Sequence, residues 1–155
     1  MSEGPERAPR LPPRWFIRAA WVVHRAIYSV TGGRFGLRSP TADSYGLMRL
    51  RTVGRRTGAE RVAIHGYYED GPNLVTMAMN GWADPEPAWW LNVQAHPDAT
   101  VDLTDGSRPV HVRAAVGDER SRLWATWAAY DKGLDALAAR RSRQTQVVSL
   151  EPRDT

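Results

Sequence analysis

A glycine-bounded run of basic residues is the first feature of the sequence that could do chemistry. Residues 54–58 read GRRTG, and a further arginine follows three positions later. Glycines allow positive φ and bring backbone N–H groups close to an anion, while arginine and threonine side chains hold phosphate or carboxylate oxygens. The candidate anion-binding residues are Gly54, Arg55, Arg56, Thr57, Gly58 and Arg61. On its own, the run is more simply explained as a solvated basic turn between two strands.

A second candidate site lies where a predicted strand ends, at residues 79–82, and continues into the tryptophan-rich segment 87–92. A strand that loses its partner exposes N–H and C=O groups, which can bind the edge of a heteroaromatic ring. Met79 and Trp89 could then cover the flat faces of such a ring. The alternative is that Trp89 and Trp90 only pack a short helix onto the sheet. Seven tryptophans in 155 residues, each needing a partner for its N–H when buried, favour a ligand pocket.

The sequence offers no side-chain reaction machinery. Its four histidines lie on four different predicted elements without metal-ligand spacing, there is no cysteine, and no serine stands in a nucleophile elbow. We therefore predict no catalytic side chain and no metal site. If the protein is an enzyme, its chemistry belongs to a cofactor.

The hydropathy pattern predicts a small antiparallel barrel of about six strands with helices outside it, in the α+β class. The predicted strands are residues 45–53, 61–69, 73–80, 99–104, 108–116 and 145–150. The predicted helices are residues 14–31, 87–95, 118–130 and 133–141, with Asp118 as the N-cap of the third. A hairpin turn is expected at residues 105–107. No GxGxxG follows a strand, which argues against a Rossmann site.

Composition limits the class of protein. The chain has 42% hydrophobic and 25% charged residues, which is ordinary globular usage and excludes a mostly disordered, collagen-like or bitopic membrane chain. Residues 1–13 contain four prolines and are expected to form a disordered tail, leaving 14–155 as a single domain. Residues 1–61 carry twelve arginines against four acidic residues, so the first part of the chain is suited to an anionic partner.

Three separated segments resemble one known family. Residues 50–61 (LRTVGRRTGAER), 75–103 (VTMAMNGWADPEPAWWLNVQAHPDATVDL) and 139–152 (ARRSRQTQVVSLEP) are similar, in this order, to motifs of the deazaflavin-dependent nitroreductases of actinobacteria. The resemblance implies a split β-barrel, of about six mostly antiparallel strands, that binds coenzyme F-420, an 8-hydroxy-5-deazaflavin with a phospholactyl-oligoglutamate tail. It further implies an oxidoreductase that passes a hydride from the reduced coenzyme to a quinone, a nitro-compound or an activated double bond.

The resemblance also implies roles for individual residues. Arg55, Arg56, Thr57 and Arg61 would hold the phosphate and the anionic tail, and Trp89 would lie beside the ring. The backbone that would edge the deazaflavin belongs to Met77, Ala78, Met79, Asn80 and Gly81. Asn92 is expected to fix the short helix.

The chain departs from better-known members of the family near the acceptor. Met79 and Asn80 stand where those members have a Ser-Lys pair, and Trp82 replaces a small residue. Other members of the family line the acceptor pocket with tyrosines. In this chain only Tyr130 falls at such a position, and Leu134 stands at another. Trp82, Tyr130 and Leu134 are therefore the candidate substrate-pocket residues, with the identity of the acceptor open.

Alternatives from other classes are a non-catalytic carrier of coenzyme F-420 and the same fold carrying FMN. The predicted helix at residues 14–31 could rest on an anionic membrane surface, or equally pack across the barrel or close over the pocket. The expected location is the cytoplasm, with association to the inner face of the membrane as one option. No nucleic-acid partner is expected, and a homodimer is compatible with the sequence.

Overall fold

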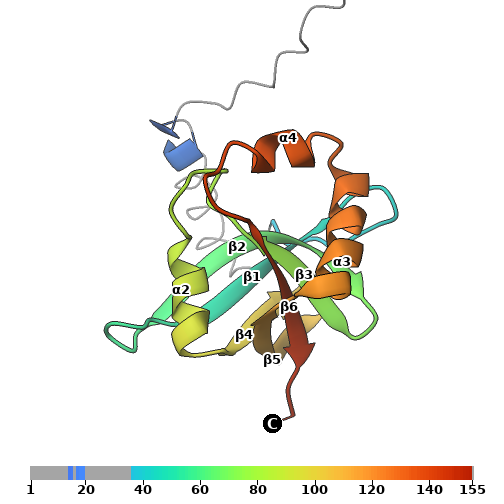
Figure 1. Cartoon of the computed structure of the whole chain (residues 1–155). Helices are drawn as coiled ribbons and strands as arrows, with labels where there is room; N and C mark the ends of the chain where they lie inside the picture. Colours follow the sequence, from blue (N-terminus) through green and yellow to red (C-terminus); the bar gives the residue numbers. More distant parts are fainter. Residues whose placement is uncertain (1–13, 16, 20–35, 155) are drawn as a thin grey trace, which may run out of the picture. The chain divides into compact units, whose positions relative to one another are not determined.

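A computed structural model describes residues 14, 15, 17–19 and 36–154 of the chain (Figure 1). The chain divides into two units, Met1–Gly36 and Leu37–Thr155. In the first unit the described residues 14, 15 and 17–19 are helical, as predicted. The rest of the predicted helix and the predicted tail at 1–13 lie outside the described residues. None of the described helices is long and apolar enough to cross a membrane.

Residues 37–154 fold into an antiparallel barrel whose paired strands follow the order β1-β2-β3-β6-β5-β4 (Figure 1). The strands are β1 (Gly46–Val53), β2 (Glu60–Asp70), β3 (Asn73–Ala78), β4 (Asp98–Leu103), β5 (Gly106–Ala114) and β6 (Gln146–Pro152). The helices are α2 (Ala88–Ala95), α3 (Gly117–Tyr130) and α4 (Leu134–Ala138). The predicted barrel with outer helices is confirmed.

Alternation of side chains builds the barrel wall. In β1, Gly46, Met48, Leu50 and Thr52 are buried, while the residues between them are only partly covered. On the outer surface Arg49 and Arg51 of β1 meet Asp102 of β4 at 3.3 and 3.0 Å. Burying one side chain such as Leu50 contributes about 1.5–3 kcal/mol, so the period-two pattern fixes which face of β1 points inward.

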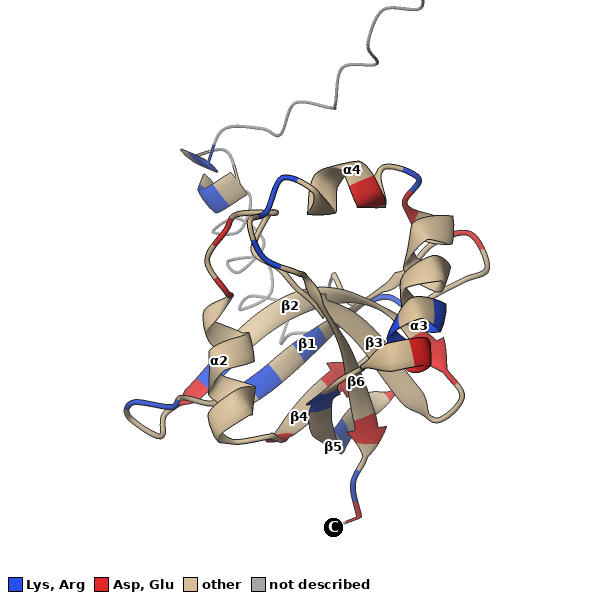
Figure 2. Cartoon of the chain, in the orientation of Figure 1, with Lys and Arg blue, Asp and Glu red and all other residues tan. Residues whose placement is uncertain are grey.

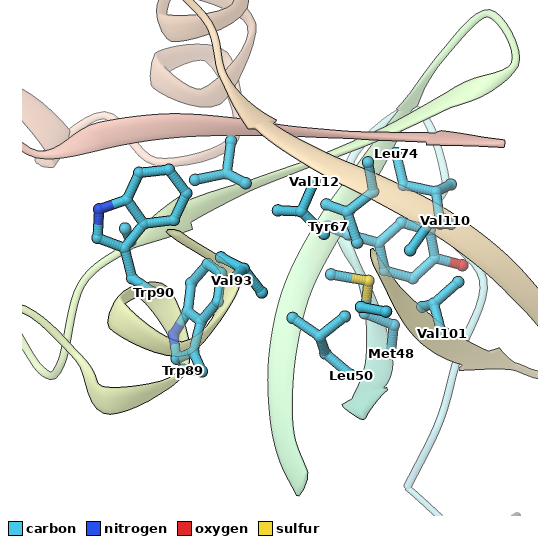
Figure 3. Packing of buried hydrophobic residues seen from close by; sticks show 14 of the residues in the cluster. Met48, Leu50, Tyr67, Leu74, Trp89, Trp90, Val93, Val101, Val110 and Val112 are labelled. Carbon is cyan, nitrogen blue, oxygen red and sulfur yellow. The ribbon is translucent and has the colours of Figure 1, made fainter. Parts of the chain in front are cut away.

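The apolar core has two parts. The first fills the barrel and extends to α2; in Figure 3, Trp89, Trp90 and Val93 of α2 lie at one end of it and Tyr67 at the other. The second lies between the barrel and the late helices and includes Tyr68, Trp127 and Leu134. Tyr68 joins α3 to the barrel, because its buried hydroxyl donates to the Leu123 carbonyl at 2.8 Å.

The backbone pairing between β2 and β3 is short, although the six strands form a closed barrel. These strands share three registered pairs, ending at Tyr68 opposite Val75. Beyond that point the hydroxyl of Thr76 donates to the carbonyl of Gly66 at 2.8 Å, so a side chain replaces the backbone ladder. The last residues of β3 pair with β6 instead, as far as Ala78 opposite Gln146. This is the strand end, free of one partner, that the sequence predicts.

Three local predictions are wrong. Asp118 lies inside the first turn of α3, and the N-cap is Val116, which has extended backbone and no capping side chain. The β4–β5 hairpin turns at Thr104 and Asp105, because Leu103 already pairs with Gly106. The helix predicted at 133–141 is helical only at Leu134–Ala138.

Candidate functional site

The basic turn between β1 and β2 is tightly closed. The N–H of Gly54 donates to the Ala59 carbonyl at 2.8 Å, and that of Gly58 to the Gly54 carbonyl at 2.9 Å. Of these two glycines only Gly58 has a positive φ, at 74°. At Gly54 the glycine instead lets two backbone segments approach closely, because a Cβ at this position would lie 3.0 Å from the carbonyl oxygen of Ala59. Both glycines are therefore required by the fold of the turn, for different reasons.

Asn92 attaches this turn to helix α2. Its side-chain Oδ1 accepts the backbone N–H of Arg55 at 3.2 Å and the Nη1 of the same residue at 3.0 Å. Asn92 is 4% exposed, so this amide joins the turn to the helix from a buried position. The sequence predicts that Asn92 fixes the short helix. In the structure the side chain of Asn92 binds Arg55, so it connects that helix to the anion turn.

Two arginines of the predicted anion site keep their charges available. Arg56 and Arg61 are exposed and make no ion pair with any residue that the structure describes. The nearest acid in sequence, Glu60, lies 3.7 Å from Arg51 on β1. Figure 2 shows the basic residues of this turn at its projecting tip beside α2. Unpaired guanidinium groups at a glycine turn are suited to phosphate and carboxylate oxygens.

A hollow of about 350 Å³ lies on the other side of the same turn. It is lined by Arg51, Thr52, Val53, Gly58, Glu60, Asp98, Ala99, Thr100 and Arg153. Its charges are paired, since Arg51 lies 3.7 Å from Glu60 and Arg153 lies 3.7 Å from Asp98. None of the predicted ring-edge residues lines it. The exposed tip of the turn is therefore the better anion site of the two.

The predicted ring edge begins where β3 ends. Met77 and Ala78 are buried and Met79 is partly covered, and the N–H of Met79 turns back to the Met77 carbonyl at 3.1 Å. A second reversal follows at once, as the N–H of Ala83 donates to the Asn80 carbonyl at 3.0 Å.

The second reversal contains a strained residue. Gly81 and Trp82 at its centre have φ values of 55° and 62°, as a type I′ turn requires. Trp82 is the only non-glycine residue with positive φ among those the structure describes. The left-handed conformation costs about 1–2 kcal/mol for a residue with a Cβ, and such strain gathers at ligand sites.

Trp89 is buried against β2. It is 7% exposed, and its ring centroid lies 4.6 Å from that of His65, with the planes tilted by 54°. The Nε1 of Trp89 and the Nε2 of His65 are both buried without a hydrogen-bond partner in the described structure. Burial lowers the pKa of His65 to about 4, so this imidazole is neutral at physiological pH. Two unpartnered polar atoms at one aromatic contact point to a group that the protein alone does not supply.

The three candidate substrate-pocket residues gather in the second apolar cluster. Trp82 and Leu134 are 8% and 1% exposed, and Tyr130 packs against the same cluster. The hydroxyl of Tyr130 donates to the Thr41 carbonyl at 3.3 Å. Trp82 and Leu134 are therefore buried members of this cluster, and Tyr130 is the partly exposed residue among the three candidates.

Sequence reasoning missed two residues of this region. Arg141 is buried and binds the loop after β3, and His65 is partly buried against Trp89, with its Nε2 covered. Nothing in the run ARRSR separates Arg141 from its exposed neighbours. The alternation of β2 does place His65 on the same face as Tyr67, and that was the one available signal.

Solved structures define the class of the fold. The chain superimposes with a TM-score of 0.64 on a structure described as a domain-swapped dimer, at 20% identity over 86% of this chain and 99% of that one. It matches an F420-H2-dependent reductase with a TM-score of 0.62, at 21% identity over 75% of this chain and all of the other. A pyridoxamine 5′-phosphate oxidase-like protein of Listeria innocua gives 0.50 at 15% identity, covering 70% and 84% of the two chains. The fold is a split β-barrel.

The family follows from sequence. Residues 21–152 match the F420H(2)-dependent quinone reductase family, and the chain belongs to that family. An F420H(2)-dependent quinone reductase of Mycobacterium tuberculosis (strain H37Rv) is 34% identical over 94 residues, 58% of this chain. That match spans 62% of the relative's length. A second protein of that strain with the same family designation is 29% identical over 118 residues, 76% of this chain and 96% of its own. The resemblance to deazaflavin-dependent enzymes predicted from the motifs is confirmed.

Proposed function

We propose that this protein is an oxidoreductase that uses reduced coenzyme F-420 to reduce a small electron-poor acceptor, with a quinone as the foremost candidate. Membership of the F420H(2)-dependent quinone reductase family supports this, as do relatives that carry this name. The observation on this chain that carries the proposal is the position of α2. Its Asn92 contacts the anion turn, and its Trp89 contacts β2 next to the point where pairing with β3 ends.

A series of contacts connects the anion turn, through α2 and β2, to the end of β3. Asn92 binds Arg55 of the turn, and Trp89, one helical turn earlier, packs at a tilt against His65 of β2. The next residue of β2, Gly66, binds the hydroxyl of Thr76 at the start of the free end of β3. A ligand with an anionic tail and a flat ring fits this order of groups.

The residues present suit coenzyme F-420 in particular. Arg56 and Arg61 provide two unpaired positive charges for a phosphate with an oligoglutamate tail, which is more than one FMN phosphate needs. The unpartnered Nε1 of Trp89 and Nε2 of His65 offer polar contacts at the ring end. When bound, the reduced coenzyme supplies a hydride to the acceptor.

The chain's own contribution to such a reaction is binding and alignment. Arg55, Arg56, Thr57 and Arg61 would hold the tail, and the backbone of Met77, Ala78, Met79, Asn80 and Gly81 would orient the ring. Trp82 and Tyr130 would limit the size of the acceptor and exclude water from its face.

The direct test is the anaerobic oxidation of reduced coenzyme F-420 by the purified protein with menadione as acceptor, with a nitroaromatic compound in a parallel reaction. Menadione-dependent oxidation supports the proposal. Tight binding of the coenzyme without turnover of either acceptor would favour the carrier function. Binding of FMN with no response to F-420 would favour the FMN alternative.

A further inference from the structure

Arg141, which follows α4, is buried and uses its whole guanidinium group. Its side chain is 0% exposed. A guanidinium has five N–H donors, and here each has an acceptor at 2.8–3.3 Å. Nε donates to the carbonyl of Ala83, Nη1 to the carbonyl of Ala78 and to Thr145 Oγ1, and Nη2 to the carbonyl of Asp84 and to Glu86 Oε1.

These acceptors enclose the strained turn that follows β3. Ala78 comes before Gly81 and Trp82, and Ala83 and Asp84 come after them, so one side chain fixes both ends of the loop. A second attachment lies next to the first. Ser142 donates its N–H and its hydroxyl to the two carboxylate oxygens of Asp84, at 2.6 and 3.0 Å.

The geometry requires arginine. Lysine has three donors on one nitrogen and cannot reach carbonyls that are spread around a planar fork. The charge is balanced by Glu86, whose side chain is 16% exposed and lies 2.8 Å from Nη2. A buried ion pair by itself is weak evidence for stability. The specific effect of the Arg141 guanidinium is to hold three backbone carbonyls, those of residues before and after Trp82, in fixed positions.

We propose that Arg141 is a positioning residue: it fixes the backbone of residues 78–84, and through it the surface that the loop gives to the deazaflavin ring and the acceptor. The role in catalysis rests on the function proposed above. The ordering of the loop by Arg141 does not, and the two can be measured separately.

The test compares wild-type protein with Arg141→Lys, using Arg143→Ala as the matched control. Arg143 is half exposed and lies 3.8 Å from the same Glu86. Hydrogen exchange of the coenzyme-free protein is followed by mass spectrometry for peptides covering 78–84 and the turn at 54–58. We expect exchange in 78–84 to rise about tenfold in Arg141→Lys, from the loss of charged hydrogen bonds, with no change at 54–58 or in Arg143→Ala.

The second reading is kinetic. In Arg141→Lys the KM for menadione should rise about tenfold, while the Kd of coenzyme F-420 should rise by less, because the anion turn that would hold the tail is attached separately by Asn92. Faster exchange with unchanged KM and kcat would overturn the positioning role. Unchanged exchange would overturn the proposal altogether.

A variant of the arginine's own partner guards against a folding failure. If Arg141→Lys does not fold, Glu86→Gln keeps an acceptor for Nη2 but removes the opposite charge, and it should raise exchange in 78–84 and the KM for menadione in the same direction. No change in either quantity would contradict the proposal. If the wild-type protein does not oxidise the reduced coenzyme, the proposed function fails, and with it the role of Arg141 in catalysis. The hydrogen-exchange result would still decide whether Arg141 orders the loop.

Discussion

The side-chain oxygen of Asn92 accepts two hydrogen bonds from Arg55, one from its backbone N–H at 3.2 Å and one from its guanidinium at 3.0 Å. One amide therefore determines both the path of the basic turn and the direction of its first arginine. Because Asn92 belongs to α2, which also carries Trp89, the two ends of the proposed coenzyme site are joined by a single rigid helix.

Asn92→Ala should weaken coenzyme F-420 binding about tenfold, since it releases two hydrogen bonds that hold the turn. The measurement is a fluorescence titration of the variant against the wild-type protein. Gln94→Ala, at an exposed position of the same helix, is the control. Equal affinities in Asn92→Ala and wild type would show that the turn is formed without this tether.

Arg55→Ala combined with Arg56→Ala should weaken binding of the coenzyme strongly at low ionic strength. The loss should become smaller at about 1 M salt, where the Debye length falls to about 3 Å. Arg108→Ala, on the distant β4–β5 hairpin, should leave the affinity unchanged at both salt concentrations. An affinity of the double variant that matches wild type at low salt would remove the turn from the site.

The stability of the fold should depend on the protonation of His65. Its pKa is about 4 in the folded protein and about 6.5 in an unfolded chain, so between these values the unfolded state binds more protons. The free energy of unfolding should therefore fall as the pH is lowered from about 6.5 to about 4, by up to about 3 kcal/mol, and this contribution should not fall further below pH 4.

Urea denaturation at pH 7.5 and pH 5 measures this effect. His65→Phe, which keeps an aromatic ring against Trp89, should lose less stability at pH 5 than the wild-type protein does. His96→Gln, at an exposed position, should behave as the wild type. The same loss of stability in His65→Phe and wild type would assign the pH dependence to other groups.

Tyr68→Phe should reduce the free energy of unfolding by about 1–3 kcal/mol, because the Leu123 carbonyl is left without the donor that it has at 2.8 Å. Thermal or urea unfolding gives the value, and Tyr45→Phe, at an exposed ring, is the comparison. No difference between the two variants would mean that water replaces the Tyr68 hydroxyl.

The parts of the fold that depend on local pattern are predictable from the sequence. The alternation around Met48 and Leu50 defines β1, and the glycines of GRRTG define the anion turn. Boundaries were less accurate where neighbours decide them. The register of β4 against β5 sets the hairpin turn at Thr104 and Asp105, and α3 begins at Gly117, one residue before the predicted N-cap.

The supporting residues of the site were not predictable in the same way. The contact of Asn92 with Arg55 spans 37 positions, and that of Arg141 with Ala83 spans 58. Neither follows from periodicity, because each depends on how α2 and the segment between α4 and β6 pack against the barrel. Arginine and asparagine are mostly exposed in folded proteins, so sequence alone gave no reason to bury Arg141.

The most direct test of the central claim is a titration of the purified protein with oxidised coenzyme F-420, followed by tryptophan fluorescence, with FMN as the control ligand. With Trp89 beside the ring, we predict saturable quenching by F-420 that is weakened in the Arg55→Ala, Arg56→Ala double variant, and little response to FMN. The absence of saturable binding of F-420, or equal binding of FMN, would contradict the assignment of this turn and strand end as a deazaflavin site.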